Sequence, residues 1–315
     1  MLDQMLQGAK TVAIGGHERP DGDCAGSCTG LYRYICDNYK DIDVDVYLQP
    51  VPESFKIVED MKYHKHEICA DKKYDLFIAL DCGDAQRLGF SLPLFENASR
   101  TFCVDHHISN VGFADENVID ADASSTCELV FDLLDKEKIT KPIAEALYLG
   151  IVHDTGVFQY SCASPKTFMA AAFLLGKGVD APTLIDTTYY EKTFEQNQVL
   201  GQALLKSERL LDGKCIASVI TLDDMAKFHV TDEDMEGIVS QLRVTKGVDT
   251  AIFLYEKTAG VFKASLRSKK IVDVSKIAVT FAGGGHVRAA GCTLEGNPDE
   301  IIKDILEEIK KQLNG

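Results

Sequence analysis

Carboxylate and imidazole side chains gather at the ends of four apolar segments of this chain. They are His17, Asp21 and Asp23 in GHERPDGDCAGS, Asp81 in LFIALD, Asp105, His106 and His107 in VDHH, and Asp154 in GIVHDTG. Four aspartates converging at about 5 Å would repel one another by roughly 3 kcal/mol per pair at an effective dielectric constant of about 20. Six such pairs exceed the net stability of a domain, which is about 5–15 kcal/mol. If these residues converge, cations must lie among them.

Two divalent cations would balance the charges of Asp21, Asp23, Asp81 and Asp154. Oxygen and nitrogen ligands without thiolates suit Mn²⁺, Mg²⁺ or Fe²⁺ better than a structural zinc, and we expect Mn²⁺. Two such ions about 4 Å apart clamp a phosphoryl group and lower the pKa of a bridging water. Taken singly, Asp81 is better interpreted as a helix N-cap and PDGD as a turn. Only the joint occurrence of these residues predicts a metal centre.

A parallel sheet would bring these residues to one place. Apolar runs predict strands at 11–16, 43–49, 74–81 and 101–105, and helical spacing follows at 24–39, 125–136, 142–152 and 166–177. Strands that alternate with helices favour an α/β fold with a doubly wound, mainly parallel sheet. Ligands bind in such folds beyond the carboxyl ends of the strands. Asp154 reaches that edge only if its helix returns to it.

The pattern changes after residue 185. We expect a metal-binding domain at 1–185, a polar helical connector at 186–211, and a smaller α/β domain with a mixed sheet at 212–315. In this last domain KASLRSK places Lys263, Ser265 and Arg267 on one face of a strand, where arginine offers a bidentate fork for phosphate. Considered alone, it is an exposed edge strand.

Composition limits the partners. The 315 residues carry a formal net charge of −16, which argues against binding long duplex nucleic acid. No apolar run approaches the length of a membrane span, and the N-terminus lacks the apolar region of a signal peptide. The ten cysteines are scattered along the chain, and we therefore interpret them as reduced residues of the core rather than as a disulfide scaffold. We therefore expect a cytoplasmic protein that does not bind membranes, and we leave open whether it forms a homodimer.

The motifs HERPDGDCAGS, LDCGD, VDHH and GIVHDTGVF resemble the four motifs of DHH-family phosphoesterases, and GGGHVRAAG at 283–291 resembles the signature of their DHH-associated C-terminal domain. The chain is most similar to the bacterial bifunctional oligoribonucleases (nanoRNases)/pAp phosphatases. The resemblance implies that His17, Asp21 and Asp81 hold one metal. It assigns a second metal to Asp23, Asp81, His106 and Asp154, with Asp81 bridging.

The same resemblance suggests catalytic and substrate-binding residues. His107 would face the substrate, and Asp105 would orient the histidine pair. The substrate-binding residues that we expect are Arg267, Ser265, Gly283, Gly284, Gly285, His286 and Arg87. The three glycines would let backbone N–H groups approach an anion, although a flexible turn is the simpler interpretation of the run by itself. Asp84 stands where many relatives carry asparagine, which we expect to affect substrate contacts near Arg87.

Three functions remain open. The first is hydrolysis of short oligoribonucleotides (nanoRNA) or 3′-phosphoadenosine 5′-phosphate (pAp) by attack of metal-bound hydroxide on phosphorus. The second uses the same site on cyclic dinucleotides, on linear pApA or on inorganic polyphosphate. The third is a nucleotide-binding sensor without catalysis. Short RNA, a mononucleotide or a dinucleotide is the expected partner, because no long basic track is present for a longer strand.

Overall fold

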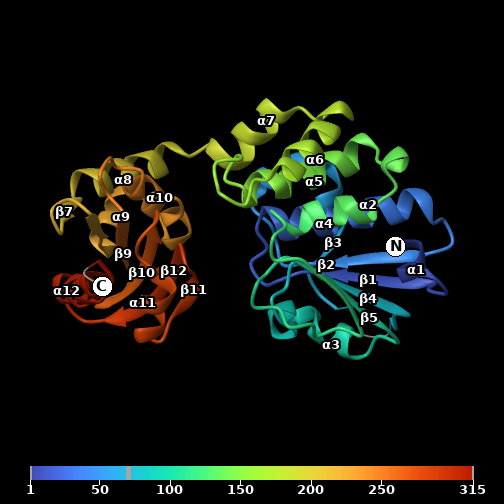
Figure 1. The fold of residues 1–315 in the computed structure, drawn as a ribbon, viewed down its shortest axis with the longest axis horizontal. Coiled ribbons are helices and arrows are strands. Elements are labelled where there is room, and N and C mark those ends of the chain that lie inside the picture. Colours follow the sequence, from blue (N-terminus) through green and yellow to red (C-terminus); the bar gives the residue numbers. More distant parts are fainter. Residues whose placement is uncertain (1, 69–71, 314–315) are drawn as a thin grey trace. The chain divides into compact units, whose positions relative to one another are not determined.

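The computed structural model describes residues 2–68 and 72–313. The chain forms two compact units, Met1–Glu191 and Lys192–Gly315. Figure 1 shows both units as sheets covered by helices, which confirms the expected α/β class. The segment 186–211, expected as a connector, is divided between them. Its first part, Asp186–Tyr190, is a π-helical turn of the first unit, and the helix Phe194–Leu205 packs in a core of the second.

The first unit contains a six-stranded sheet in the order β3-β2-β1-β4-β5-β6, and every neighbouring pair is parallel. Its strands are β1 Thr11–Gly15, β2 Asp43–Tyr47, β3 His64–Lys65, β4 Leu76–Leu80, β5 Thr101–Asp105 and β6 Glu116–Ile119. The chain runs outward from β1 to β3 and then resumes at β4 on the other side of β1. The order therefore reverses between β1 and β4, where ligands of such sheets bind beyond the strand ends.

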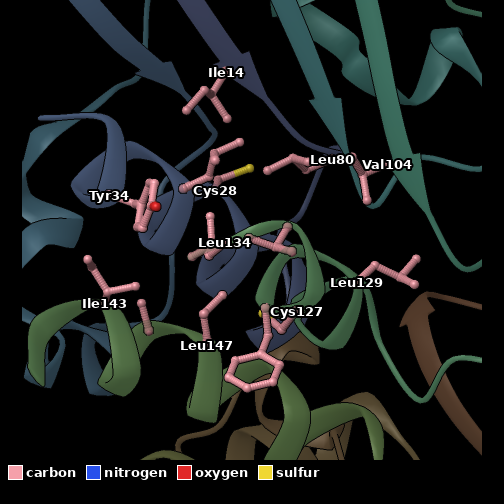
Figure 2. Packing of buried hydrophobic residues seen from close by; sticks show 14 of the residues in the cluster. Ile14, Cys28, Tyr34, Leu80, Val104, Cys127, Leu129, Leu134, Ile143 and Leu147 are labelled. Atoms are coloured by element: carbon pink, nitrogen blue, oxygen red, sulfur yellow. The ribbon is translucent and has the colours of Figure 1, made fainter. Parts of the chain in front are cut away.

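Helices cover both faces of this sheet (Figure 1). The helices are α1 Leu2–Leu6, α2 Gly22–Asn38, α3 Leu92–Glu96, α4 Thr126–Leu133, α5 Lys141–Asp154, α6 Pro165–Gly176 and α7 Ala181–Ile185. Short 3₁₀ turns lie at η1 Glu53–Ile57, η2 Glu59–Tyr63, η3 Ala85–Ser91 and η4 Lys136–Lys138, and η5 is the π-helical Asp186–Tyr190. Alternate strand residues face opposite layers, since Ile14, Leu80 and Val104 pack with α2, α4 and α5 (Figure 2), whereas Phe77 packs on the α3 side.

Small residues let α2 and α5 pack closely. A Cβ atom on Gly26 would lie 2.4 Å from the carbonyl oxygen of Ala146. A Cβ atom on Gly150 would lie 2.2 Å from Cys127 Sγ and 2.7 Å from Asp23 Oδ1. The close approach places the beginning of α2 beside the end of α5. It therefore carries Asp154 to the edge of the sheet where Asp23 lies.

The second unit contains a mixed sheet in the order β11-β12-β10-β9-β8-β7, with β8 and β9 parallel and the other pairs antiparallel. Its strands are β7 Glu208–Leu210, β8 Cys215–Ile220, β9 Thr250–Thr258, β10 Val261–Ser268, β11 Gly284–His286 and β12 Ala289–Glu295. Its helices are α8 Phe194–Leu205, α9 Leu222–Phe228, α10 Ile238–Arg243, α11 Val274–Thr280 and α12 Pro298–Leu313, with a 3₁₀ turn η6 Asp232–Met235. Separate apolar clusters cover its two faces, one with α11 and α12 and one with α8 to α10.

Two further findings concern membrane-spanning helices and the state of the cysteines. In residues 2–68 and 72–313 no single helix has the length and apolarity to cross a membrane, although the bent pair α6 and α7–η5 passes that test when taken together. The cysteines of the described segments are all free, and most of them are buried.

Candidate metal centre

His17 and Asp81 meet where the strand order reverses. His17 follows β1 by two residues and Asp81 follows β4 directly, and the distance from His17 Nε2 to Asp81 Oδ2 is 3.5 Å. His17 Nδ1 donates to the carbonyl oxygen of Glu18 at 2.9 Å, so Nε2 is the nitrogen directed at the carboxylates. Metal-binding histidines are commonly oriented by such a bond from the other ring nitrogen. Asp21, the N-cap of α2, lies 3.7 Å from the same Nε2 atom.

Asp23 is buried against the first turn of α4. Its Oδ2 accepts the backbone N–H of Thr126 at 2.6 Å, and its Oδ1 accepts that of Cys127 at 2.8 Å. The hydroxyl of Thr126 donates to Asp81 Oδ1 at 3.1 Å. One helix start therefore holds two carboxylates, and the positive end of the helix favours their charge. Sequence reasoning missed this role, because SSTCE reads only as the beginning of a helix.

Asp154 joins the cluster from the end of α5. His106 Nε2 lies 3.1 Å from Asp154 Oδ2, 3.6 Å from Asp81 Oδ1 and 3.8 Å from Asp23 Oδ2. A single imidazole nitrogen therefore faces three carboxylates that come from α2, β4 and α5. The end of α5 thus lies at the carboxyl ends of the strands, which is the condition under which Asp154 can join the cluster.

His107 belongs to a chain of hydrogen bonds beside the cluster, and its Nδ1 lies 3.6 Å from Asp81 Oδ1. Its Nδ1 lies 2.7 Å from Asp105 Oδ1, and Asn110 Nδ2 donates to Asp105 Oδ2, also at 2.7 Å. Asn110 also donates to the carbonyl oxygen of Cys82 at 2.9 Å and is nearly buried. Asp105 thus orients His107, the second histidine of the pair. Asn110 is a further residue that sequence reasoning missed, although it follows in the same loop.

The carboxylates of the cluster shift the pKa values of one another and of the neighbouring histidine. Burial and the charges of Asp81 and Asp154 raise the pKa of Asp23 well above its usual value. Burial and the Asp81 charge also raise the pKa of Asp154 to about 6, although its bond with His106 opposes them. Burial disfavours protonated His106, but Asp154, Asp23 and Asp81 outweigh it and raise the pKa to about 10. These shifts all follow from several carboxylates lying close together, and a nearby cation would act in the opposite direction on the pKa of the aspartates.

In the two residues nearest the first strand, His17 and Asp21, burial and neighbouring charges also act on the pKa in opposite directions. Burial disfavours protonated His17, but its contacts with Cys24, Asp21 and Asp81 raise its pKa above the usual value. Dehydration acts against the charged form of Asp21, whereas bonds from His17 and from the N–H groups of Cys24 and Asp23 hold its pKa at about 2. Titratable groups whose pKa values are strongly shifted by one another are typical of functional sites.

Three groups of side chains have ligand atoms close enough to hold a metal ion. They are His17, Cys24 and Asp81; Asp81, His106 and His107; and Asp23, His106 and Asp154. Asp81 belongs to two groups, and its backbone φ of +58° lies in the left-handed region, which aspartate tolerates better than most residues. The predicted residues His17, Asp21, Asp23, Asp81, His106 and Asp154 thus all lie in one cluster. The donor set of carboxylate oxygens and imidazole nitrogens fits divalent cations such as Mn²⁺ or Mg²⁺.

The remaining predicted residues lie at two other places. Arg87, in η3, is exposed, and its carbonyl oxygen accepts the N–H of Glu18 at 2.8 Å, so it supports the loop after β1. In the second unit, Ser265 and Arg267 share the half-exposed face of β10. Through β12, Ser265 aligns with Gly284 and Arg267 aligns with His286. Arg267 and His286 therefore point to the same face of the sheet, about 10 Å apart at two strand spacings.

The glycine run is not a flexible turn. Gly284 to His286 form β11, an edge strand paired with β12, and Gly283 precedes it. Glycine is needed at 283 and 285, because a Cβ atom would lie 2.3 Å from the carbonyl oxygen of Gly291 and 2.5 Å from that of Ala289, respectively. Backbone N–H groups on the unpaired side of an edge strand can approach an anion.

Comparisons with known proteins agree with the fold of both units. Residues 11–151 match the DHH family, N-terminal domain, and residues 212–315 match the DHHA1 domain. The chain is 29% identical to the bifunctional oligoribonuclease and PAP phosphatase NrnA of Thermus thermophilus, over 96% of this chain and 90% of that protein. It is 28% identical to the probable enzyme of that name from Streptococcus mutans, over 96% and 95%. The crystal structure of an exopolyphosphatase-related protein from Bacteroides fragilis superposes with a TM-score of 0.92 at 26% identity, over 98% and 94%.

Proposed function

We propose that this chain, a phosphoesterase built from the N-terminal domain of the DHH family and a DHHA1 domain, hydrolyses short oligoribonucleotides and pAp. The observation that carries the proposal is the cluster of four aspartates and two histidines at the reversal of strand order. The names of the relatives from Thermus thermophilus and Streptococcus mutans support the choice of substrates.

The cluster would hold two divalent ions, and we propose Mn²⁺. One ion would be held by His17, Asp21 and Asp81, and the other by Asp23, Asp81, His106 and Asp154. Bound divalent ions neutralise charge on a phosphoryl group and lower the pKa of water. The residues fit because each of the four aspartates faces a histidine nitrogen and because Asp81 faces both histidines.

His107 would bind the substrate and handle its proton. Asp105 Oδ1 lies 2.7 Å from His107 Nδ1 and would orient the imidazole, which would donate to a phosphoryl oxygen or to the leaving oxygen. The Asp105 carboxylate raises the pKa of His107 despite its partial burial, which favours the protonated, donating form. Asn110 keeps Asp105 in place from the other side.

The second unit would recognise phosphate. Arg267, whose Nη1 donates to the carbonyl oxygen of Leu266 at 3.0 Å, would bring a guanidinium to the phosphate, and His286 would bring an imidazole on the same face of the sheet. Ser265, Gly283, Gly284 and Gly285 would complete the binding surface with a hydroxyl and backbone N–H groups. These side chains supply local positive charge in a chain of net charge −16, which an anionic substrate needs.

A hydrolysis panel with Mn²⁺ tests the proposal. The substrates are pAp, RNA dimers to pentamers, pApA, cyclic di-AMP and inorganic polyphosphate, and the variant Asp81→Ala is compared with the exposed control Asp122→Ala. Turnover of pAp and short RNA that Asp81→Ala abolishes and Asp122→Ala retains would support the proposal. Preference for pApA, cyclic di-AMP or polyphosphate would keep the phosphoesterase activity but change the proposed substrate. Binding of Mn²⁺ and nucleotide without hydrolysis of any substrate would contradict the proposal that the protein is an enzyme.

A further inference from the structure

A thiol lies inside the cluster that the proposed function fills with hard cations. Cys24 is in the first turn of α2, directly after Asp23, and its side chain is fully buried. Its Sγ, one ring nitrogen of His17 and one carboxylate oxygen of Asp81 all lie within 4.8 Å of one another. The backbone N–H of Cys24 also donates to Asp21 Oδ1 at 3.1 Å. Sulfur is therefore a potential third donor type at the first metal position, which the sequence interpretation treated as core.

The packing around Cys24 keeps its sulfur at this place. Gly16, directly after β1, has no side chain there, and a Cβ atom on it would lie 2.2 Å from Cys24 Sγ. The sulfur also contacts the carbonyl oxygen of His17 at 3.9 Å. Cys28, one turn further along α2, is equally buried, but no metal-holding group of the described residues includes it. Cys28 also hydrogen-bonds with Cys24, so Cys28→Ala controls for the loss of a neighbouring buried thiol.

The three donors are close enough to reach one ion after a small movement. Zn²⁺ binds thiolate sulfur at about 2.3 Å and histidine nitrogen or carboxylate oxygen at about 2.0–2.2 Å. The sulfur and another ligand atom of one ion can therefore be separated by at most about 4.5 Å. The three atoms lie within 4.8 Å of one another, and His17 Nε2 lies 3.5 Å from Asp81 Oδ2. A mixed set of nitrogen, sulfur and oxygen favours Zn²⁺ or Cd²⁺ over Mn²⁺, because thiolates are soft ligands and Mn²⁺ stands lowest among the divalent first-row metals in affinity.

We propose that His17, Cys24 and Asp81 form a site for a thiophilic divalent ion, which competes with Mn²⁺ at the first metal position. The competition with Mn²⁺ rests on the proposed function, whereas the site itself does not. On binding, the Cys24 thiol and protonated His17 each release a proton to solvent, and a metal–sulfur bond and a metal–nitrogen bond form. Zn²⁺ at this position would withdraw His17 and Asp81 from the Mn²⁺ site. Hydrolysis would therefore be inhibited by Zn²⁺, and Cys24 would set the concentration at which this occurs.

Cadmium is the probe for sulfur ligation, because thiolate binding to Cd²⁺ produces an ultraviolet charge-transfer band that is independent of enzyme activity. The full-length, metal-free protein is titrated with Cd²⁺ as wild type, as Cys24→Ala and as Cys28→Ala. We expect a band of one thiolate per ion in the wild type and in Cys28→Ala, and its loss in Cys24→Ala together with an affinity for Cd²⁺ lower by about 100-fold. A band that persists in Cys24→Ala, or that is lost only in Cys28→Ala, would overturn the proposal.

A second measurement needs no variant, so misfolding of Cys24→Ala cannot obscure the answer. X-ray absorption of the wild-type protein loaded with one Zn²⁺ should show a sulfur shell at about 2.3 Å. A first shell of oxygen and nitrogen alone would overturn the site. Failure of the proposed function remains distinguishable, because absence of Mn²⁺-dependent hydrolysis together with a Cys24-dependent cadmium band would remove only the phosphoesterase substrates and keep the metal site.

Discussion

Replacing Thr126 by valine should weaken Mn²⁺ binding even though Thr126 touches no proposed ion. Thr126 is fully buried, and its hydroxyl donates to Asp81 Oδ1 at 3.1 Å. Valine keeps the shape of the side chain but removes this donor. The backbone N–H of residue 126 still donates to Asp23, so the start of α4 and the hold on Asp23 are retained. The substitution therefore isolates one hydrogen bond to one carboxylate, and Thr126 is a positioning residue.

The expected magnitude follows from two independent estimates. A hydrogen bond to a charged group contributes about 1.5–3 kcal/mol. Loss of a partner that orients a metal ligand typically lowers metal affinity by about 10–100-fold, which is about 1.4–2.8 kcal/mol. The two ranges agree, so we expect the dissociation constant for Mn²⁺ to rise by about 10–100-fold in Thr126→Val. Thr126→Ser retains the hydroxyl and should stay within about threefold of the wild type.

Isothermal titration of the metal-free protein with Mn²⁺ measures this effect directly. Hydrolysis at increasing Mn²⁺ provides the second readout, because a weakened site should recover most of its rate when Mn²⁺ is raised above the new dissociation constant. If Thr126→Val binds Mn²⁺ as tightly as the wild type does, the hydroxyl does not position Asp81. If Thr126→Ser is as weak as Thr126→Val, packing rather than the hydrogen bond is responsible.

Three further predictions concern other parts of the first unit. Asn110→Ala removes the donors to Asp105 Oδ2 and to the carbonyl of Cys82. We therefore expect kcat to fall by about tenfold or more, while the affinity for Mn²⁺ stays within about threefold. Steady-state kinetics and Mn²⁺ titration measure the two quantities, and a change in the affinity alone would contradict the prediction. Burial, with a smaller contribution from the charge of His66, lowers the pKa of His64 to about 4. Because the unfolded histidine binds its proton near pH 6.5, this contribution to stability is complete above about pH 6.5 and is lost as the pH falls to about 4, by about 3 kcal/mol. Urea denaturation across this range should show a flatter pH dependence in His64→Leu, and an equal slope would refute the assignment. Chelation of Mn²⁺ from a protein loaded at about a hundred times the dissociation constant should lower the free energy of unfolding by about 2.7 kcal/mol, and an unchanged melting temperature after chelation would argue against a bound ion.

The convergence of the acidic residues could be predicted because it depends on simple rules. Asp81 follows an apolar strand and His17 follows another, and the carboxyl ends of parallel strands share an edge. Asp154 was less certain from the sequence, because it ends a helix rather than a strand. What brings it to the cluster is the close packing of α2 and α5 at Gly26 and Gly150, which depends on tertiary contacts.

The residues that support the cluster could not be predicted in the same way. Thr126 lies about a hundred residues from Asp23 and its segment reads as an ordinary helix start, so its contacts are visible only after folding. Cys24 was assigned to the core, and it is buried, but burial alone does not tell toward which neighbours a sulfur points. The edge strand β11 was missed because three consecutive glycines favour a turn in isolation, whereas close backbone approach is what requires them.

Gly150 limits how this protein can change, in evolution or in engineering. Glycine in the middle of a helix is an obvious target for stabilisation, since alanine would favour α5 by about 0.5–1 kcal/mol. At this position the added methyl group would instead meet Cys127 and the carboxylate of Asp23. Any lineage or library that strengthens this helix at residue 150 must therefore move Asp23 at the same time. A more rigid α5 would require a Cβ atom at residue 150, whereas an intact acidic cluster requires that this atom be absent.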